Sequence, residues 1–125
     1  AGTDVIRING VPEMKGGTYS IIPDQIEAGT FMLLAAAAGG EVLVRNIIPT
    51  HMNCLTSKLE EMGVNVTEYD DSIRIERDGA LRGISVRTMP YPGFPTDLQP
   101  QMVALLSTVG GKSTVDPFKP LGGDF

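Results

Sequence analysis

The segment best suited to chemistry is residues 90–97, which read Pro-Tyr-Pro-Gly-Phe-Pro-Thr-Asp. Its three prolines each fix the backbone angle φ, so the loop loses little further conformational entropy when it binds a ligand. The loop delivers Thr96 and Asp97 to the start of a predicted helix, where backbone amides can receive an anion or a polar ligand. From local physics alone, a stiff connection in which Asp97 caps the helix is favoured over a binding site.

Pro100 affects how free the Asp97 carboxylate is. If Thr96 caps the helix, Pro100 is the fourth helical residue and removes the first backbone hydrogen bond. If Asp97 is the cap, Pro100 is the third helical residue and costs no donor. Because capping occupies the carboxylate, the second alternative competes with catalysis by Asp97.

A lysine after a glycine pair, at residues 110–112, imitates the end of a phosphate-binding P-loop. The motif requires an earlier glycine at the position of Leu106, and it opens a helix, whereas this pair follows one. The helix end is therefore the better interpretation.

His51 and Cys54 lie three residues apart on a predicted helix and are the only histidine and cysteine of the chain. Zinc requires three or four ligands, and a Cys–His nucleophile pair requires an oxyanion site that nothing nearby supplies. A half-buried cysteine and a surface histidine are expected, with no metal site. The acidic pairs at 60–61 and 70–71 are interpreted as solvated surface.

The composition excludes several classes of protein. The 125 residues carry 10 basic and 15 acidic side chains, a net charge of −5, which disfavours binding to phosphate backbones. The longest wholly apolar stretch, residues 31–38, is too short to span a bilayer, and no secretory signal is visible. A single cysteine permits no internal disulfide and favours the cytoplasm.

The elements that must position these residues follow from periodicity. Helices are predicted to begin near Asp24, which can cap the first of them, near Pro49 and near the Thr96–Asp97 pair, with glycines ending each. The second helix is expected to bury a stripe formed by Met52, Leu55, Leu59 and Met62, and the first a stripe formed by Ile26, Thr30, Leu33, Leu34 and Ala37. The predicted strands are residues 5–8, 18–22, 41–45, 64–68, 72–76 and 84–88, of which 64–68 and 72–76 form a hairpin. Asp24 and Asp97 lie 73 residues apart, and the glycine pairs that follow their helices lie 71 apart, which indicates a supersecondary repeat.

Several segments taken together resemble the UDP-N-acetylglucosamine 1-carboxyvinyltransferases, of the enolpyruvyl transferase family. The similarity spans roughly residues 1–115 and is a minority of a full family chain. Its most specific motif is the Pro-Gly-Phe-Pro-Thr-Asp run at 92–97. The other matching segments are residues 2–6, 22–31, 58–64 and 88–91, with Gln99 and Gln101.

This resemblance implies a mixed α/β fold of the α+β type, an inside-out α/β barrel built from βαβαββ repeats in two globules. Residues 1–22 would be the last strands of the first globule and the crossover. Residues 23–94 would be one complete repeat of the second globule. Residues 95–125 would start the next repeat, with an atypical C-terminus after Val115 and Pro100 in place of a small residue.

The resemblance also implies a cytoplasmic transferase that moves enolpyruvyl from phosphoenolpyruvate to the 3-hydroxyl of UDP-N-acetylglucosamine, without a cofactor. That reaction is the first committed step of peptidoglycan synthesis, and so serves cell wall biogenesis, cell shape and cell division. Asp97 would contact the hydroxyl and take its proton, Thr96 would line the same site, and Asp24 would lie at the hinge near the cleft. Cys54 does not match the catalytic cysteine of the family. Because that cysteine and the phosphoenolpyruvate-binding residues lie outside the matched segment, the isolated chain is expected to be inactive.

Two other functions remain open at this point. A self-contained module could bind a small ligand or a partner through residues 90–97. RNA binding is disfavoured by the acidic charge and by only seven aromatic residues. Self-association through exposed sheet edges is a further expectation for an incomplete barrel.

Overall fold

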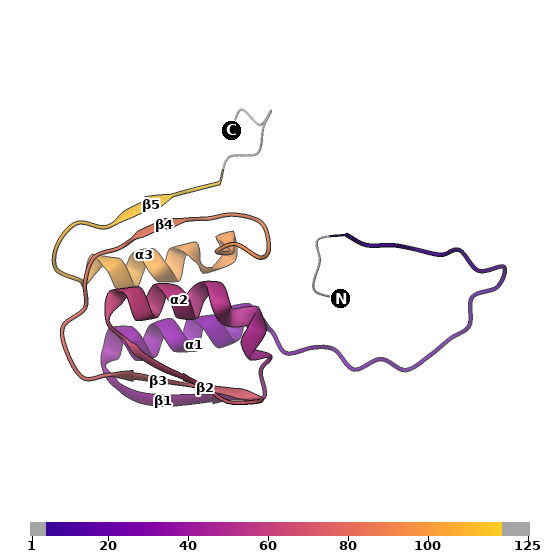
Figure 1. The fold of residues 1–125 in the computed structure, drawn as a ribbon, viewed down its shortest axis with the longest axis horizontal. Coiled ribbons are helices and arrows are strands. Elements are labelled where there is room, and N and C mark those ends of the chain that lie inside the picture. The colour runs from indigo at the N-terminus through magenta and orange to yellow at the C-terminus, as the bar shows by residue number, and fades with distance from the viewer. Residues whose placement is uncertain (1–4, 119–125) are drawn as a thin grey trace.

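The computed structural model describes residues 5–118. Within them helices alternate with strands from residue 25 onward, as Figure 1 shows. The elements in chain order are α1 (Gln25–Ala38), β1 (Gly40–Arg45), the 3₁₀ helix η1 (Pro49–Met52), α2 (Asn53–Met62), β2 (Asn65–Glu68), β3 (Ser72–Arg77), β4 (Ser85–Arg87), the 3₁₀ helix η2 (Thr96–Leu98), α3 (Gln99–Ser107) and β5 (Thr114–Asp116). The mixed α/β class expected from the sequence is confirmed.

The strands form two sheets. In the first, β3 lies between β1 and β2 and is antiparallel to both, so that Ile75 pairs with Val42 on one side and Val66 on the other. The predicted hairpin is thereby confirmed. In the second, β4 and β5 run parallel, with Val86 beside Val115.

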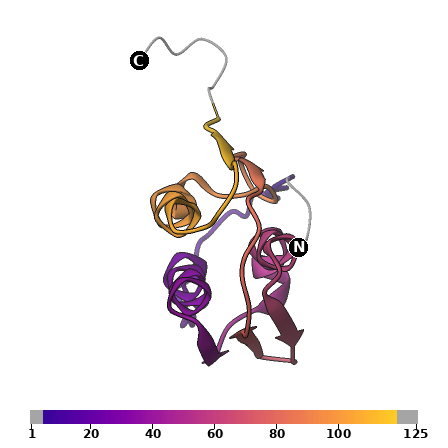
Figure 2. The ribbon, with the colours of Figure 1, turned by 90° about the vertical axis from the view of Figure 1, so that its left-hand side faces the viewer.

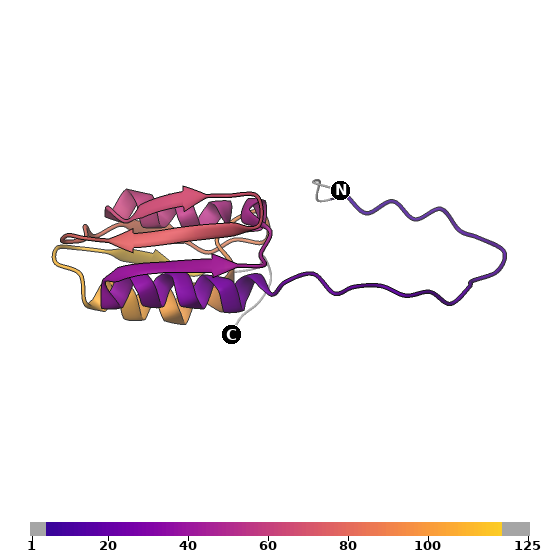
Figure 3. The same ribbon diagram turned by 90° about the horizontal axis from the view of Figure 1, so that it is seen from below.

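The elements stack in layers. In Figure 2, α1 and α2 lie on one face of the three-stranded sheet, and α3 and the β4–β5 pair lie farther from it. Figure 3 shows the opposite face of that sheet with no helix over it. The three helices run in the same direction, so α1, the η1–α2 segment and the η2–α3 segment all begin at one end of the molecule (Figures 1 and 3).

One apolar core joins the layers. The predicted stripe of α2 is confirmed, because all four of its residues are buried between the sheet and the other helices: Met52, Leu55, Leu59 and Met62. On α1 the predicted stripe is only half right. Its Leu34 is 58% exposed and its Ala37 is exposed, whereas the small side chains of Ala35 and Ala36 are buried. Small side chains let α1 lie close to the sheet and to α3, and this packing decides that the face of α1 with Ala35 and Ala36 is the buried one.

The two strands predicted before α1 are absent. Residues 5–22 contain neither helix nor strand and extend away from the body, as Figures 1 and 3 show. The predictions for 5–8 and 18–22 are wrong for this structure because a strand needs a neighbouring strand to take up its backbone hydrogen bonds. The family match at residues 2–4 and most of the atypical C-terminus, residues 119–125, lie outside the described residues.

Candidate functional site

The proline-rich loop is held by its own backbone and by one buried ring. The Met89 amide donates to the Phe94 carbonyl oxygen over 2.9 Å, and the Gly93 amide donates to that of Pro90 over 2.8 Å. Gly93 allows this closure, because a Cβ atom there would lie 2.5 Å from the Cβ of Met89. Phe94 is 2% exposed and anchors the loop in the core. The loop is therefore a fixed support for the residues that follow it.

Asp97 is exposed and does not cap a helix. The 3₁₀ helix η2 begins at Thr96 after Pro95 and has no side-chain capping bond, while Pro100 is the second residue of α3. Both sequence alternatives, a cap at Thr96 and a cap at Asp97, are wrong because a 3₁₀ turn precedes the α-helix. Pro100 costs no donor in this arrangement. Within residues 5–118, the Asp97 carboxylate has neither a hydrogen bond nor an ion pair, and Thr96 beside it is also exposed.

Leu98 fixes the position of Asp97 relative to α1. Its side chain is 2% exposed and contacts α1 at Gly29, where an added Cβ would lie 2.8 Å from Leu98 Cδ1. No residue larger than glycine fits between these segments without a shift. The start of α1 and the turn that carries Asp97 are thus packed as one unit.

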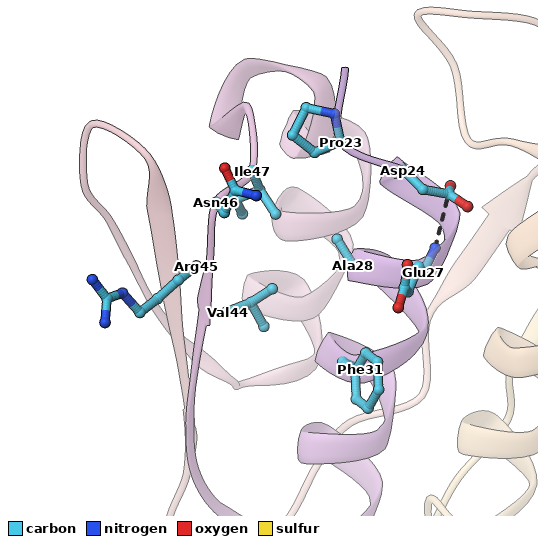
Figure 4. Close-up of a pocket in the computed structure, with 9 residues that line it drawn as sticks. All are labelled: Pro23, Asp24, Glu27, Ala28, Phe31, Val44, Arg45, Asn46 and Ile47. Atoms are coloured by element: carbon cyan, nitrogen blue, oxygen red, sulfur yellow. Dashed lines mark hydrogen bonds between the residues drawn. The ribbon is translucent and has the colours of Figure 1, made fainter. Parts of the chain in front are cut away.

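Asp24 occupies the end of α1 in a different way. Its Oδ1 atom accepts hydrogen bonds from the amides of Ile26 at 2.8 Å and Glu27 at 3.4 Å, which confirms the predicted cap. Asp24 also lines a groove of about 330 Å³ between α1 and β1, shown in Figure 4. The remaining lining residues are Pro23, Glu27, Ala28, Phe31, Val44, Arg45, Asn46 and Ile47. Figure 4 shows the Arg45 guanidinium pointing away from the groove, which leaves two carboxylates as its charged groups.

A second recess joins the loop to the starts of α1 and η1. It measures about 320 Å³ and is lined by Ile22, Pro23, Gln25, His51 and Tyr91. The rings of His51 and Tyr91 meet edge to face, with centroids 6.5 Å apart and planes at 83°. Sequence reasoning did not connect these two residues, because they lie 40 positions apart and belong to different motifs.

The remaining candidate residues do not form a reactive centre. Cys54 is half-buried, as predicted, and burial raises the pKa of its thiol, an effect that the nearby Lys58 charge partly offsets. The lysine of residues 110–112 does not open a helix, so these residues are no P-loop. The expected helix end at the glycine pair is also wrong, because α3 ends at Ser107 and Thr108 caps it. In residues 5–118, no three His, Cys, Asp or Glu side chains are grouped to hold a metal ion. No helix among the same residues is long and apolar enough to cross a membrane.

The geometry brings three sequence candidates to one end of the fold. Asp24 and Asp97 stand where α1 and η2 begin, and His51 stands in η1 at the same end (Figure 1). A small recess lined by Gln25, His51 and Pro95 links these three segments. The arrangement presents one free carboxylate, on Asp97, and one engaged carboxylate, on Asp24. An unengaged carboxylate on a rigid support can accept a proton from a bound hydroxyl group.

Comparison with known proteins agrees with the resemblance found in the sequence. The chain is 54% identical over 116 residues to the UDP-N-acetylglucosamine 1-carboxyvinyltransferase of Clostridium botulinum, which covers 93% of this chain and 28% of that protein. It is 55% identical over 116 residues to that of Desulfofundulus thermocisternus, covering 92% of this chain and 48% of that protein. The chain therefore spans less than half the length of these relatives.

A solved structure shows the same fold. The crystal structure of the enolpyruvyl transferase NikO from Streptomyces tendae matches with a TM-score of 0.64 at 21% identity, over 82% of this chain and 25% of that one. The sequence model of the family named EPSP synthase (3-phosphoshikimate 1-carboxyvinyltransferase) matches residues 1–116. This match ends where the resemblance seen in the sequence ends, and from it we conclude that the chain belongs to the EPSP synthase family.

Proposed function

We propose that this chain is the part of a UDP-N-acetylglucosamine 1-carboxyvinyltransferase that supplies the general base, Asp97. In this reaction the sugar 3-hydroxyl adds to phosphoenolpyruvate, and phosphate is then eliminated to leave the enolpyruvyl ether. Asp97 takes the proton of the hydroxyl as the oxygen attacks, and Thr96 lines the site. Phosphoenolpyruvate is a co-substrate, and no cofactor takes part.

The observation that carries this proposal is the contrast between the two aspartates. The Asp24 carboxylate accepts hydrogen bonds from two backbone amides. The Asp97 carboxylate is exposed and accepts no hydrogen bond within residues 5–118, and the buried side chains of Phe94 and Leu98 hold its backbone in place. A general base needs a free carboxylate held in one place, because its proton transfer depends on geometry before pKa. Asp24 therefore has a structural role at the hinge in this proposal.

Neither of the two pockets described above, within residues 5–118, offers a cation that would bind the phosphates. Residues 5–118 present two carboxylates and no inward-facing cation at the groove beside Asp24, and the lining of the recess at His51 includes no lysine or arginine. We propose that the isolated chain is catalytically inactive. Phosphate release from phosphoenolpyruvate and UDP-N-acetylglucosamine by the purified chain alone, in proportion to its concentration, would refute this.

A chimera tests the function itself. Residues 1–116 replace the matching segment of the Clostridium botulinum relative, and phosphate release is measured with both substrates. We expect an active chimera that loses about 10²–10⁴-fold in kcat when Asp97→Asn is introduced, the usual contribution of a general base. Asp78→Asn is the matched control, because Asp78 is exposed and follows β3 at the opposite end of the fold, where α1 ends, and it should leave kcat unchanged. Equal activity of the two variants would rule out Asp97 as the base.

The His51–Tyr91 recess favours a second candidate, a binding module that uses residues 90–97. Its walls offer an amide, an imidazole and a phenol, which suit a polar ligand without charge. Calorimetric titration of the isolated chain with UDP-N-acetylglucosamine separates the candidates. Tight binding that Asp97→Asn leaves unchanged supports the module.

The finer fold assignment is part of the same proposal. Residues 23–94 contain α1, β1, α2, β2 and β3 in that order, which supports a βαβαββ repeat whose first strand the structure does not form, and β4 follows β3 before the boundary at residue 95. We assign residues 1–22 to the end of the preceding globule and residues 95–125 to the start of the next repeat. The single cysteine supports a cytoplasmic location, and exposed sheet edges support self-association.

A further inference from the structure

The turn that carries Asp97 begins a helix without a cap. The first amides of a helix have no partner inside it, and within residues 5–118 neither η2 nor α3 receives a side-chain capping bond. Pro100, at the start of α3, has no amide to donate. The position of Asp97 is therefore set by the contacts that hold this turn against the rest of the fold.

Leu98 supplies one such contact, and it is apolar. Its methyl groups lie against Gly29 of α1. Apolar packing has no preferred direction, so this contact alone would let α3 turn about its own axis and carry Asp97 with it. Fixing the rotation of α3 requires a second, directional contact on the same side of the helix.

Gln101 and Thr30 form a directional contact of this kind. Gln101 follows Asp97 by about one helical turn, and its Nε2 atom donates a hydrogen bond to Thr30 Oγ1 over 3.0 Å. Their helices, α3 and α1, lie side by side in Figure 2, and both side chains are half-buried. Leu98 and Gln101 are three residues apart and so share one face of α3. Together they fix both the distance and the rotation of α3 relative to α1.

The Thr30 hydroxyl is itself held in one orientation. It donates to the carbonyl oxygen of Ile26 over 2.8 Å, and the Ile26 amide in turn donates to Asp24. Because a hydroxyl group has one proton and this one bonds to Ile26, its oxygen is left to accept from Gln101. A continuous series of hydrogen bonds therefore links the capped first turn of α1 to the uncapped first turn of α3.

Gln101 is an unfavourable residue for a purely structural role at this place. Its Oε1 atom is buried and has no hydrogen-bond partner within residues 5–118. An unpaired buried acceptor destabilises a fold, and an apolar side chain of similar size would avoid that cost. We propose that Thr30 and Gln101 are positioning residues, which hold Asp97 where it can take the proton of the substrate hydroxyl. This inference rests on the proposed function, and neither residue needs to touch the substrate.

Combining Thr30→Val with Gln101→Leu in the chimera tests the inference. The two changes remove the hydrogen bond and nearly keep the shape of both side chains, and replacing both partners by apolar groups changes stability little. We expect kcat to fall about tenfold or more while KM for both substrates stays within about twofold, because a displaced base slows proton transfer without weakening binding. Thr30→Ser keeps the hydroxyl and should restore most of the kcat that Thr30→Val loses.

Ser57→Ala is the matched control for the loss of a helical hydroxyl group. Ser57 Oγ donates to the Asn53 carbonyl oxygen over 2.7 Å, which is the same four-residue bond that Thr30 makes on α1. Ser57 is exposed and, among the described residues, bonds to no second helix, so the substitution should leave kcat unchanged.

An Asp97→Asn background shows whether the pair acts through the base. With no base to position, the same two substitutions should lower kcat further by less than about twofold. An unchanged kcat for the double variant, or an equal loss with and without Asp97, overturns the inference. Asp97→Asn alone tests the proposed function, so a loss in that variant without a loss in the double variant refutes only the positioning.

Amide hydrogen exchange of the full 125-residue chain tests the contact without catalysis. The amides of Leu98 and Gln99 donate within the turn that carries Asp97, so their exchange rates, measured by NMR, report on this turn. We expect both rates to rise about fivefold or more in the double variant, while amides in the middle of α2 keep theirs. Unchanged exchange at Leu98 and Gln99 would show that the pair does not hold the turn, and would overturn the inference.

Discussion

Substituting Gly29 by alanine tests whether α1 and the turn that carries Asp97 are in direct contact. A Cβ atom at position 29 would lie 2.8 and 3.1 Å from the two δ-methyl groups of Leu98, and 3.0 Å from Leu55 Cδ2. Such overpacking costs about 1–3 kcal/mol, while alanine improves helix propensity over glycine by about 1 kcal/mol. The expected net result is a loss of up to about 2 kcal/mol in the free energy of unfolding, measured by urea denaturation followed by far-UV circular dichroism.

A double-mutant cycle isolates the contact. Leu98→Val removes both δ-methyl groups that approach Gly29, so Gly29→Ala should be less destabilising in that background by about 1 kcal/mol or more. Gly79→Ala serves as the control, because nothing lies within 4 Å of a Cβ atom there. If Gly29→Ala instead stabilises the otherwise unchanged chain by the full difference in helix propensity between alanine and glycine, Leu98 does not lie close to Gly29. The packing of α1 against the turn that carries Asp97 would then also be wrong.

Two further predictions concern Asp24, Asp97 and Cys54. Asp24→Ala should lower the free energy of unfolding by about 1 kcal/mol because it removes the cap of α1, whereas Asp97→Ala should change it by less than about 0.5 kcal/mol, as both urea titrations will show. Equal losses would contradict the assignment of one engaged and one free carboxylate. Burial raises the pKa of the Cys54 thiol. The rate at which iodoacetamide alkylates the thiol should therefore rise with pH about a midpoint that is higher in the folded chain than in the urea-unfolded chain. The folded state keeps the thiol proton to a higher pH than the unfolded state does. The contribution of the protonated Cys54 thiol to the free energy of unfolding is therefore complete below a pH of about 8.5 and declines above it. A folded-state midpoint at or below the unfolded one would contradict the burial of Cys54, and Cys54→Ser provides the unreactive control.

Local pattern was sufficient for several elements. The two alternating runs around residues 69–71 predict a hairpin, and β2 and β3 form it. The stripe on α2 predicts the four residues that are buried, because that helix has one apolar side and one polar side. The cap at Asp24 was equally readable, since an aspartate after proline and before an apolar run has few other roles.

Pattern was insufficient wherever neighbours decide the outcome. On α1 nearly every side chain is apolar or small, so periodicity could not choose a face. Packing against the sheet and the neighbouring helices buried Ala28, Ala35 and Ala36 and left Ala37 exposed. The start of the third helix was misassigned because a 3₁₀ turn and an α-helix differ by one residue in hydrogen-bond spacing. The His51–Tyr91 recess had no signal in the sequence, because it is built from three segments that meet only in the folded chain.

The sequence by itself determined the family, the acidic single-cysteine composition and the rigid loop that carries Asp97, because these depend on residue types and short spacings. The tertiary structure decided which aspartate is free. Asp24 faces the amides of its own helix, whereas a 3₁₀ turn places Asp97 beyond the reach of such bonds. It also decided that residues 18–22 form no strand in this structure, since strand pairing requires a neighbour that no local pattern can supply.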